Sequence, residues 1–190
     1  AAMLERLGAR VRVLPIARDT DTSLRTVLAL AQGADLIVTI GGASVGDHDL
    51  VAGVADGLGM DQAFYKVAMR PGKPLLAGRL NGTALVGLPG NPVSAMVCGT
   101  VFLTPMLNAM MGLPRAPAPR VTLPLAAALD ANGPREHYMR AHVTGGTVQD
   151  AGPQDSSLLS VLSAANALIV RPPNDAPRST GEQVEVILLS

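Results

Sequence analysis

An apolar run, Leu36–Ile40, leads directly into a segment that is rich in glycine and ends in carboxylates. The run is short, β-branched and not alternating, which predicts a buried strand. Glycines let the backbone turn and present its N–H groups to an anion, and carboxylates suit a divalent metal. The segment contains Gly41, Gly42, Gly46, Asp47 and Asp49. It predicts a site for a phosphate that arrives with a metal ion; the alternative is an ordinary strand-to-helix turn with solvated acids.

Two further loops follow predicted strands. Residues 19–22 follow a strand predicted over residues 11–16 and hold Asp19. Residues 89–92 follow another strand and begin a helix, with Asn91 as its N-cap. Ligands of open α/β sheets bind beyond the carboxyl ends of the strands, and a helix N-terminus favours phosphate. We therefore expect these two loops and the glycine-rich segment to converge on one cleft.

Three cations, Lys66, Arg70 and Lys73, lie close together in a segment that Pro71 and Pro74 stiffen. An arginine can grip an oxyanion with two hydrogen bonds, and a lysine supplies a compact charge. Beside an acidic, glycine-rich loop the cluster indicates a metal-plus-oxyanion site; the alternative is a solvated surface patch. No Ser/His/Asp or Cys/His catalytic arrangement is recognisable in the sequence.

Composition excludes several classes of protein. The chain of 190 residues has 15 basic and 15 acidic side chains and only 2% aromatic residues, which argues against nucleic acid as a partner. Its single cysteine, Cys98, permits no internal disulfide. We find no apolar run long enough to span a bilayer and no secretory signal, so we expect no membrane partner and a cytoplasmic location. The chain opens without methionine, which suggests a piece of something longer.

The order of predicted elements gives an α/β fold class with a second, smaller β unit. Residues 1–113 alternate helix and strand, which predicts a three-layer, mostly parallel sheet. Asn81 and Gly82 predict a hairpin within this sheet. Residues 114–119 are a proline-rich linker, and residues 120–190 predict a mainly β domain. Its predicted elements are strands over residues 121–125, 138–144 and 184–189 and a short helix over residues 157–165.

Three motifs, taken together, resemble the molybdopterin molybdenumtransferase family, which includes the MoeA proteins and the E domain of gephyrin. They are GGASVGDHD at residues 41–49, KVAMRPGKP at 66–74 and GLPGNPVS at 87–94. Residues 8–21 resemble the start of the family's molybdopterin-binding domain. Residues 154–157, 165–166 and 181–184 resemble its C-terminal β-domain. The resemblance therefore extends to both ends of the chain and implies a MogA-like fold for the α/β unit.

The resemblance also implies a reaction. Enzymes of this family use Mg²⁺ and insert molybdate into adenylylated molybdopterin with release of AMP. Asp49, Lys66, Arg70 and Lys73 would be the catalytic residues, with Asp49 and Asp19 as metal or pterin-phosphate carboxylates. The other residues implied to bind the cofactor are Gly41, Gly42, Ser44, Gly46, Pro89, Gly90, Asn91, Ser156 and Arg140.

The sequence departs from the family pattern in two respects. Arg70 stands where many relatives have lysine, which keeps the charge but changes the shape of the molybdate pocket. The family's enzymes also carry two further domains, the first strand of the molybdopterin-binding domain and a TGDE-type loop, which are not recognisable here, so the resemblance implies that residues 1–113 lack that first strand. The resemblance thus implies a partial site that binds ligand weakly and turns over poorly. It also implies a homodimer for the full-length protein, with a molybdopterin adenylyltransferase as a candidate partner.

Two other functions stay open at this point. One is a scaffolding or binding module like the gephyrin E domain, because a fold does not fix a role. The other is a stand-alone domain that binds a pterin or nucleotide phosphate, like the adenylyltransferases or CinA-type proteins. The cationic cluster favours the enzyme, and the β-rich segment after Pro119 counts against the stand-alone domain. The sequence does not choose between molybdate and tungstate.

Overall fold

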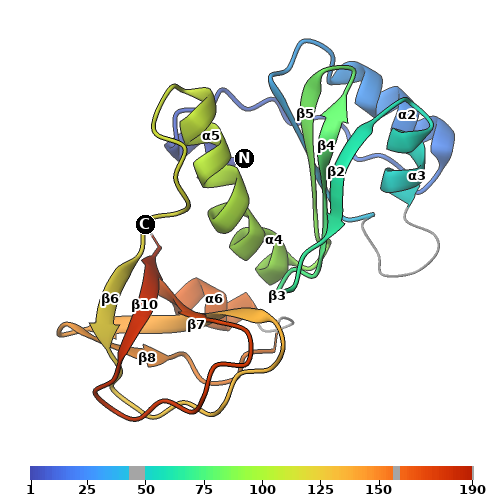
Figure 1. The fold of residues 1–190 in the computed structure, drawn as a ribbon. Helices are drawn as coiled ribbons and strands as arrows, with labels where there is room; N and C mark the ends of the chain where they lie inside the picture. The colour runs from blue at the N-terminus through green and yellow to red at the C-terminus, as the bar shows by residue number, and fades with distance from the viewer. Residues whose placement is uncertain (43–49, 156–158, 190) are drawn as a thin grey trace.

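The computed structural model describes residues 1–42, 50–155 and 159–189. It has an α/β half, with a four-stranded sheet A, and a β half, with a six-stranded sheet B. A helical rod that starts at α4 and ends at α5 lies between the two sheets (Figure 1). This arrangement confirms the predicted order of an α/β unit followed by a mainly β unit.

Sheet A has the strand order β1-β5-β4-β2. Its strands are β1 (Leu36–Ile40), β2 (Asp61–Lys66), β4 (Pro74–Leu80) and β5 (Thr83–Leu88). Asn81 and Gly82 both have positive φ, at 50° and 82°, and join β4 to β5 in an antiparallel pair. Two adjacent residues of this conformation form the turn that matches the twist of a hairpin. The predicted hairpin is confirmed.

Two details of the predicted sheet are wrong. Only β1 and β5 pair in parallel, while β4 pairs antiparallel with both β5 and β2, so the described sheet is mixed rather than mostly parallel. Residues 11–16 form no strand, and Val13 and Ile16 are 78% and 97% exposed. A β-branched run becomes a strand only where a neighbouring strand offers hydrogen-bond partners. The described chain provides none for these residues.

Helices cover both faces of sheet A. Helices α2 (Asp21–Leu30) and α3 (Leu50–Asp56) pack on one face, and the rod packs on the other. Neighbouring residues of β4 divide between the layers: Leu75 packs with the rod and Leu76 with α2 and α3, and both are fully buried. Strand side chains alternate between faces, so this division is the expected one for a three-layer unit.

The rod consists of α4 (Pro92–Cys98), a π-helical turn η1 (Gly99–Leu103) and α5 (Thr104–Met110). The sequence predicts a kink or restart near Pro105, and η1 ends at Leu103, two residues before that proline, which has no N–H to donate. By length and composition alone, residues 92–110 could cross a membrane, which corrects the expectation that no apolar run is long enough. Val93 and Leu103 are each 1% exposed, so we interpret the rod as a core helix.

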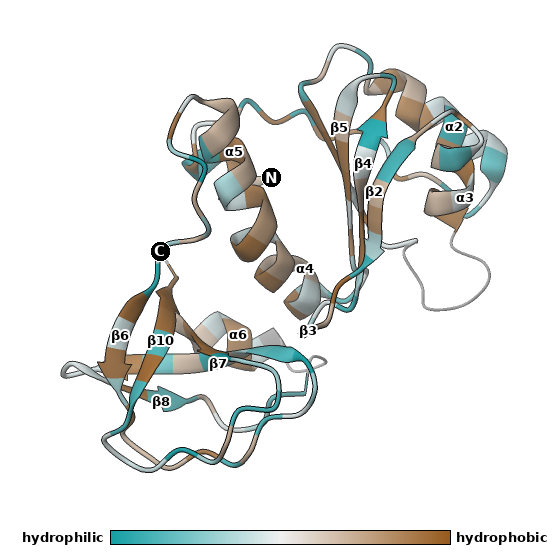
Figure 2. Cartoon of the chain, in the orientation of Figure 1, coloured by the Kyte–Doolittle hydropathy of each residue, from teal (hydrophilic) through white to brown (hydrophobic). Residues whose placement is uncertain are grey.

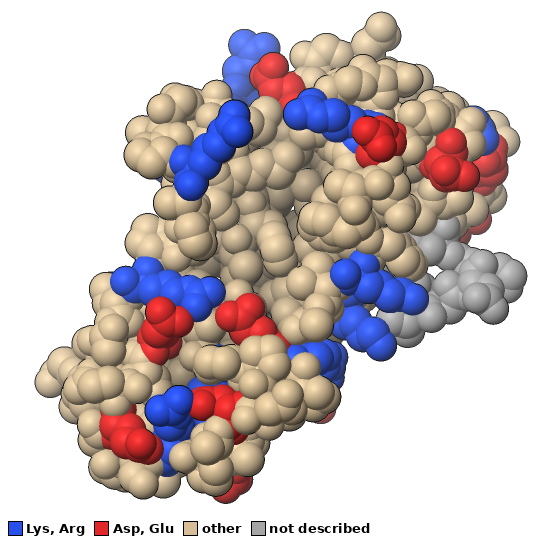
Figure 3. Space-filling view, viewed as in Figure 1, with Lys and Arg blue, Asp and Glu red and all other residues tan. Residues whose placement is uncertain are grey.

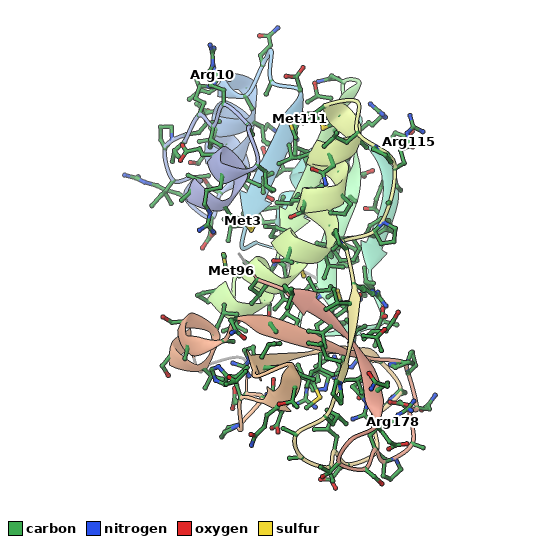
Figure 4. All side chains as sticks on the ribbon, turned by 90° about the vertical axis from the view of Figure 1, so that its left-hand side faces the viewer. Met3, Arg10, Met96, Met111, Arg115 and Arg178 are labelled. Carbon is green, nitrogen blue, oxygen red and sulfur yellow. The ribbon has the colours of Figure 1, made fainter. Side chains whose placement is uncertain are left out.

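The first helix, α1 (Ala2–Arg6), packs on the rod. A Cβ added at Gly99 would lie 2.6 Å from Cε of Met3, so glycine permits this contact. Met3 also lies near Met96 of α4 (Figure 4). Hydrophobic residues continue along the rod and onto the strands of sheet B (Figure 2). The N-terminal segment is thus part of the packed structure rather than a free tail.

Sheet B has the order β3-β7-β9-β10-β6, with β8 paired to β7. Its elements are β3 (Met69–Arg70), β6 (Val121–Pro124), β7 (Glu136–Thr144), β8 (Thr147–Asp150), β9 (Ala167–Arg171) and β10 (Gln183–Leu188), with helix α6 (Leu159–Ala164). The three strands predicted for this half are confirmed as β6, β7 and β10. Strand β9 was not predicted, although all of its residues are buried.

The two halves share one core and one strand pairing. Strand β3 belongs to the α/β half by sequence, but it pairs in parallel with β7 of the other half. Met69 of β3 packs in one cluster with Leu88 of sheet A and with Tyr138 and Leu168 of sheet B. Ala118 of the proline-rich segment is buried in the same cluster. The domain limits at residues 113 and 120 stay a prediction.

We expect the two halves to unfold together because they share this core. Each half contains one tyrosine, Tyr65 in β2 and Tyr138 in β7, so the variants Tyr65→Phe and Tyr138→Phe each leave a reporter in one half. Each variant is unfolded in urea and followed by both tyrosine fluorescence and circular dichroism. In each variant, the fluorescence midpoint should equal the circular-dichroism midpoint. Transitions that separate would mean that the halves are independent folding units.

Candidate functional site

The carboxyl ends of β1 and β5 bring two of the predicted loops together. The strands run in parallel with Ile40 opposite Leu88, and the N–H of Gly41 donates to the carbonyl of Leu88 at 3.0 Å. A Cβ added at Gly90 would lie 3.3 Å from Cα of Gly41, so a side chain there would be crowded against the neighbouring loop. Glycine at these two positions therefore lets the loops after β1 and β5 lie backbone to backbone.

The loop after β5 begins the rod as predicted. The side-chain oxygen of Asn91 accepts a hydrogen bond from the backbone N–H of Ser94 at 3.1 Å, and Pro92 occupies the first turn of α4. Asn91 is therefore an N-cap, which orients the first turn of the helix toward the loop after β1. Pro89 and Gly90 lie in the same loop, directly after β5.

Some predicted site residues lie outside the described part of the chain. They are Ser44, Gly46, Asp49 and Ser156. Gly42, the last described residue before the first of these gaps, has positive φ, and a Cβ added there would lie 2.4 Å from Cγ2 of Val51 in α3. The start of the glycine-rich segment is therefore packed directly against α3.

The three predicted cations lie on one loop at the same end of sheet A. Lys66 ends β2, opposite Pro74, and the N–H of Val67 donates to the carbonyl of Lys73 at 3.1 Å, which closes the loop. Lys66, Arg70 and Lys73 are all exposed. The Lys66 ammonium also lies 5.2 Å from the centre of the Tyr65 ring, within range of a cation–π interaction.

The β half holds this loop in place. In the pairing of β3 with β7, Arg70 lies opposite His137. The N–H of Glu136 donates to the carbonyl of Ala68 at 3.0 Å. On the other side of the loop, Gly72 packs on the buried Cys98 of α4, where a Cβ would lie 2.3 Å from the sulfur. The position of the cationic loop therefore depends on both halves of the molecule.

Arg140 of β7 joins the cations from the β half. It is 2% exposed, and its terminal Nη2 donates to the carbonyls of Pro153 and Asp155 at 3.2 and 3.0 Å. Burial lowers the pKa of Arg140, the charge of Asp155 opposes this shift, and the charge of Arg70 adds to it. Arg70 and Arg140, predicted from separate parts of the sequence, are thus within electrostatic range of each other.

A buried histidine lies at the same junction. His137 is 7% exposed, and its pKa is lowered to about 4, first by burial and then by the charges of Arg70, Arg171, Arg140 and Arg135. The imidazole is therefore neutral at physiological pH, and the junction carries positive charge from arginines alone. His137 was not among the predicted site residues, since a single histidine on a strand gives no local signal.

Asp19 lies directly before the N-cap of helix α2 and does not follow a strand. It precedes Thr20, whose hydroxyl accepts from the N–H of Ser23 and caps α2. The expectation that it reaches the cleft assumed a strand over residues 11–16, which the structure does not contain. Its part in the site stays a prediction.

The described part of the site is cationic and has no clustered metal ligands. Among residues 1–42, 50–155 and 159–189, no ion pair involves Lys66, Arg70 or Lys73, and no group of three His, Cys, Asp or Glu side chains could hold a metal ion. Basic side chains gather at the end of sheet A near β3 (Figure 3). Chemically, this arrangement suits a small oxyanion or a phosphate.

Comparison with known families matches both halves. The family described as "Probable molybdopterin binding domain" matches residues 1–109, and the one described as "MoeA C-terminal region (domain IV)" matches residues 122–189. A Mycobacterium tuberculosis protein named molybdopterin molybdenumtransferase 2 is 39% identical over 98% of the chain, and a molybdopterin molybdenumtransferase of Haemophilus influenzae is 31% identical over 97%. The chain covers 48% and 47% of these two proteins, so it spans about half their length.

Solved structures agree. A molybdopterin biosynthesis MoeA protein from Pyrococcus horikosii aligns over 100% of the chain and 46% of its own, with a TM-score of 0.84 and 25% identity. A molybdenum cofactor biosynthesis protein from Pyrococcus furiosus aligns over 98% of the chain and 61% of its own, with a TM-score of 0.79. At 21% identity, the second likeness shows the fold alone.

The depressed pKa of His137 predicts acid destabilisation. At pH above about 6.5, the usual histidine pKa, the ring is neutral in both folded and unfolded chains. As the pH falls toward 4, the unfolded chain gains a proton that the folded chain resists, and stability falls by up to roughly 3 kcal/mol. The variant His137→Gln should lose this component, as measured by urea unfolding at about pH 7 and about pH 5.

His142→Gln is the matched control, because His142 lies on the same strand and is only partly buried. It should keep the pH dependence of the parent chain. An unchanged pH dependence in His137→Gln would contradict the assignment of this component to His137.

Proposed function

Because the chain belongs to the molybdopterin molybdenumtransferase (MoeA) family, we propose that it is the part of such an enzyme that binds the oxyanion and the pterin phosphate. The proposed reaction is the insertion of molybdate into adenylylated molybdopterin with release of AMP, in the biosynthesis of the molybdenum cofactor. Since the chain spans about half the length of its relatives, the complete activity is proposed for a protein of their length, and we expect weak binding and poor turnover from the 190 residues alone.

The observation that carries this proposal is that β3 pairs with β7 at the junction of the two halves, which brings Arg70 within electrostatic range of Arg140. Molybdate is a tetrahedral oxyanion, and guanidinium groups from two directions can bind its oxygens with charge-assisted hydrogen bonds. Lys66 and Lys73, on the same loop as Arg70, add mobile charges that stabilise the negative charge of a departing phosphate. These residues orient the reactants and stabilise charge, and none is assigned a covalent step.

The loops after β1 and β5 are proposed to hold the phosphate of the pterin. Gly41 and Gly42 have positive φ, and the close contact of Gly41 with Gly90 brings two backbone segments to one rim. Backbone N–H groups in such turns bind anions without adding charge of their own. Asn91 contributes by fixing the start of α4, which supports the proposed role of Pro89 and Gly90 in the same loop. Ser44, Gly46 and Ser156 remain proposed contacts.

Mg²⁺ is proposed to accompany the phosphate, with Asp49 and Asp19 as its carboxylates. Mg²⁺ keeps several waters and needs only one or two carboxylates, so a cluster of ligands is not required. The described residues hold no such cluster, and Asp49 lies outside them. The proposal therefore needs no cluster among the described residues, and no step of the reaction is assigned to the metal ion.

The remaining proposals concern assembly and location. We propose a homodimer for the longer protein, delivery of the adenylylated pterin by a molybdopterin adenylyltransferase, and a cytoplasmic location. The proposed units are residues 1–113, a linker over 114–119 and residues 120–190, held together by the shared core. Neither nucleic acid nor a membrane is proposed as a partner, since the formal net charge is zero.

Calorimetry of the chain with sodium molybdate tests the oxyanion site. We expect Arg70→Ala to weaken molybdate binding on the order of tenfold, because a charge-assisted hydrogen bond to an anion is lost. Arg79→Ala is the matched control: it removes an equal charge from β4, where Arg79 is exposed and donates to the carbonyl of Gly82. Equal affinities of Arg70→Ala and Arg79→Ala would overturn the proposed role of the cationic loop.

Adenylylated molybdopterin and AMP test the phosphate site in the same assay. We expect binding that increases with Mg²⁺ and that loses this increase in Asp49→Ala. Binding that is indifferent to Mg²⁺ would contradict the proposed metal role, and a chain that binds neither molybdate nor the nucleotide would favour a scaffolding module instead. Molybdate insertion by the chain at the rate of a full-length relative would refute the expected partial site.

A further inference from the structure

Gln154 binds the backbone of β7 at a point on one edge between its two partner strands, β3 and β8. On that edge β3 pairs with Glu136 and His137, and β8 pairs with β7 from Ala141 onward, so the backbone of Arg140 lies between two partner strands. The side-chain amide of Gln154 lies at this point. Its Oε1 accepts from the backbone N–H of Arg140 at 2.9 Å, and its Nε2 donates at 3.1 Å to the carbonyl of Arg140, which also accepts from the N–H of Ala151 at 2.8 Å. The glutamine side chain thus supplies an acceptor for the Arg140 N–H and a second donor to its carbonyl.

The same amide also binds the Arg140 side chain and its surroundings. Oε1 of Gln154 accepts from Nε of Arg140 at 3.4 Å, and Nε2 donates to the carbonyl of Gly152 at 3.0 Å. The turn that Gln154 ties to β7 supplies the carbonyls of Pro153 and Asp155 that bind the guanidinium. Losing Gln154 therefore removes the side-chain hydrogen bonds that tie residues 153–155, whose carbonyls bind the guanidinium, to the backbone of Arg140.

The chemistry of these contacts is suited to an anion site. A buried guanidinium needs hydrogen-bond partners, and a carboxylate in that role would also neutralise it. The amide of Gln154 provides hydrogen bonds without adding a second negative charge to that of Asp155, which already acts on the guanidinium. The charge of Arg70 lies within range of the same guanidinium, which makes an anion between them more favourable.

We propose that Gln154 is a positioning residue, which holds the Arg140 guanidinium at the junction of the two halves so that it can bind the oxyanion together with Arg70. This proposal rests on the proposed function for the identity of the oxyanion. It adds a residue to the site that makes no contact with the ligand and acts through Arg140.

Asn166 provides a matched control. Its side-chain amide binds the backbone of β7 in the same way at Val143, three residues after Arg140. Oδ1 accepts from the N–H of Val143 at 2.8 Å, and Nδ2 donates to the carbonyl of Val143 at 3.1 Å. Among the described residues, neither of these hydrogen bonds involves the Arg140 side chain. A purely structural role predicts that Gln154→Ala and Asn166→Ala have the same kind of effect, whereas a positioning role separates them.

Molybdate binding, measured by calorimetry at constant ionic strength on the 190-residue chain, gives the first readout. We expect both alanine variants to lower the thermal midpoint, but only Gln154→Ala to weaken molybdate binding, on the order of tenfold. Gln154→Glu, which keeps the size of the side chain but places a carboxylate beside the guanidinium, should also weaken binding. Equal molybdate affinities of Gln154→Ala and Asn166→Ala would overturn the proposal.

A second readout needs no ligand, so that failure of the proposed function can be told from failure of this proposal. In nitrogen-15 NMR spectra, the Nε–H of Arg140 should exchange slowly with solvent in the parent chain and in Asn166→Ala, and faster in Gln154→Ala. If the parent chain binds no molybdate, the proposed function fails, and the Nε–H signal still decides whether Gln154 positions Arg140. Unchanged exchange in Gln154→Ala would overturn the positioning role.

Discussion

The pairing of β3 with β7 is the contact on which the candidate site depends. It involves only Met69 and Arg70, but it attaches a loop of the α/β half to the sheet of the β half. Met69, 1% exposed, anchors the pairing in the core that both halves share. Without it, the cationic loop would be a connection between two antiparallel strands, and Arg70 would have no fixed relation to Arg140. A short strand thus determines the geometry of a site whose charges come from both halves.

The fold treats its arginines in two ways. Arg171 is buried and bonded to the carboxylate of Asp175, which also pairs with Arg178, and the hydrogen bond from Arg178 is the largest cause that lowers the pKa of Asp175. Arg140 is equally buried, and it donates to the side-chain amide of Gln154 and to the carbonyls of Pro153 and Asp155, with the charge of Asp155 also acting on it. Arg171 is therefore held directly by a carboxylate oxygen, whereas these hydrogen bonds of Arg140 go to neutral oxygens. A buried ion pair fixes structure at the cost of desolvating both charges.

The parts of the fold that the sequence predicted correctly are those that depend on interactions between residues close together in the chain. The Asn81–Gly82 turn needs positive φ at both residues, and the Asn91 cap needs only its own first turn. The apolar and β-branched composition of residues 11–16 predicts a strand, yet a strand forms only where another strand lies beside it in the fold. The role of β3 was missed for the same reason: two residues have no periodicity, and their partner lies in a segment far away in the sequence. The sequence identified the candidate cations, but their positions along the chain did not show that Arg70 lies within electrostatic range of Arg140.

The division of the site between two sheets has a consequence for how it works. Sheet A places backbone amides at the ends of β1 and β5, while sheet B contributes Arg140 and the hydrogen bonds around it. A ligand with a phosphate at one end and an oxyanion acceptor at the other can meet both sets of groups only if the sheets keep one orientation. That orientation is fixed by the rod and by the shared core around Met69 and Tyr138. The packing of this core therefore determines how far apart the groups of sheet A and the groups of sheet B lie.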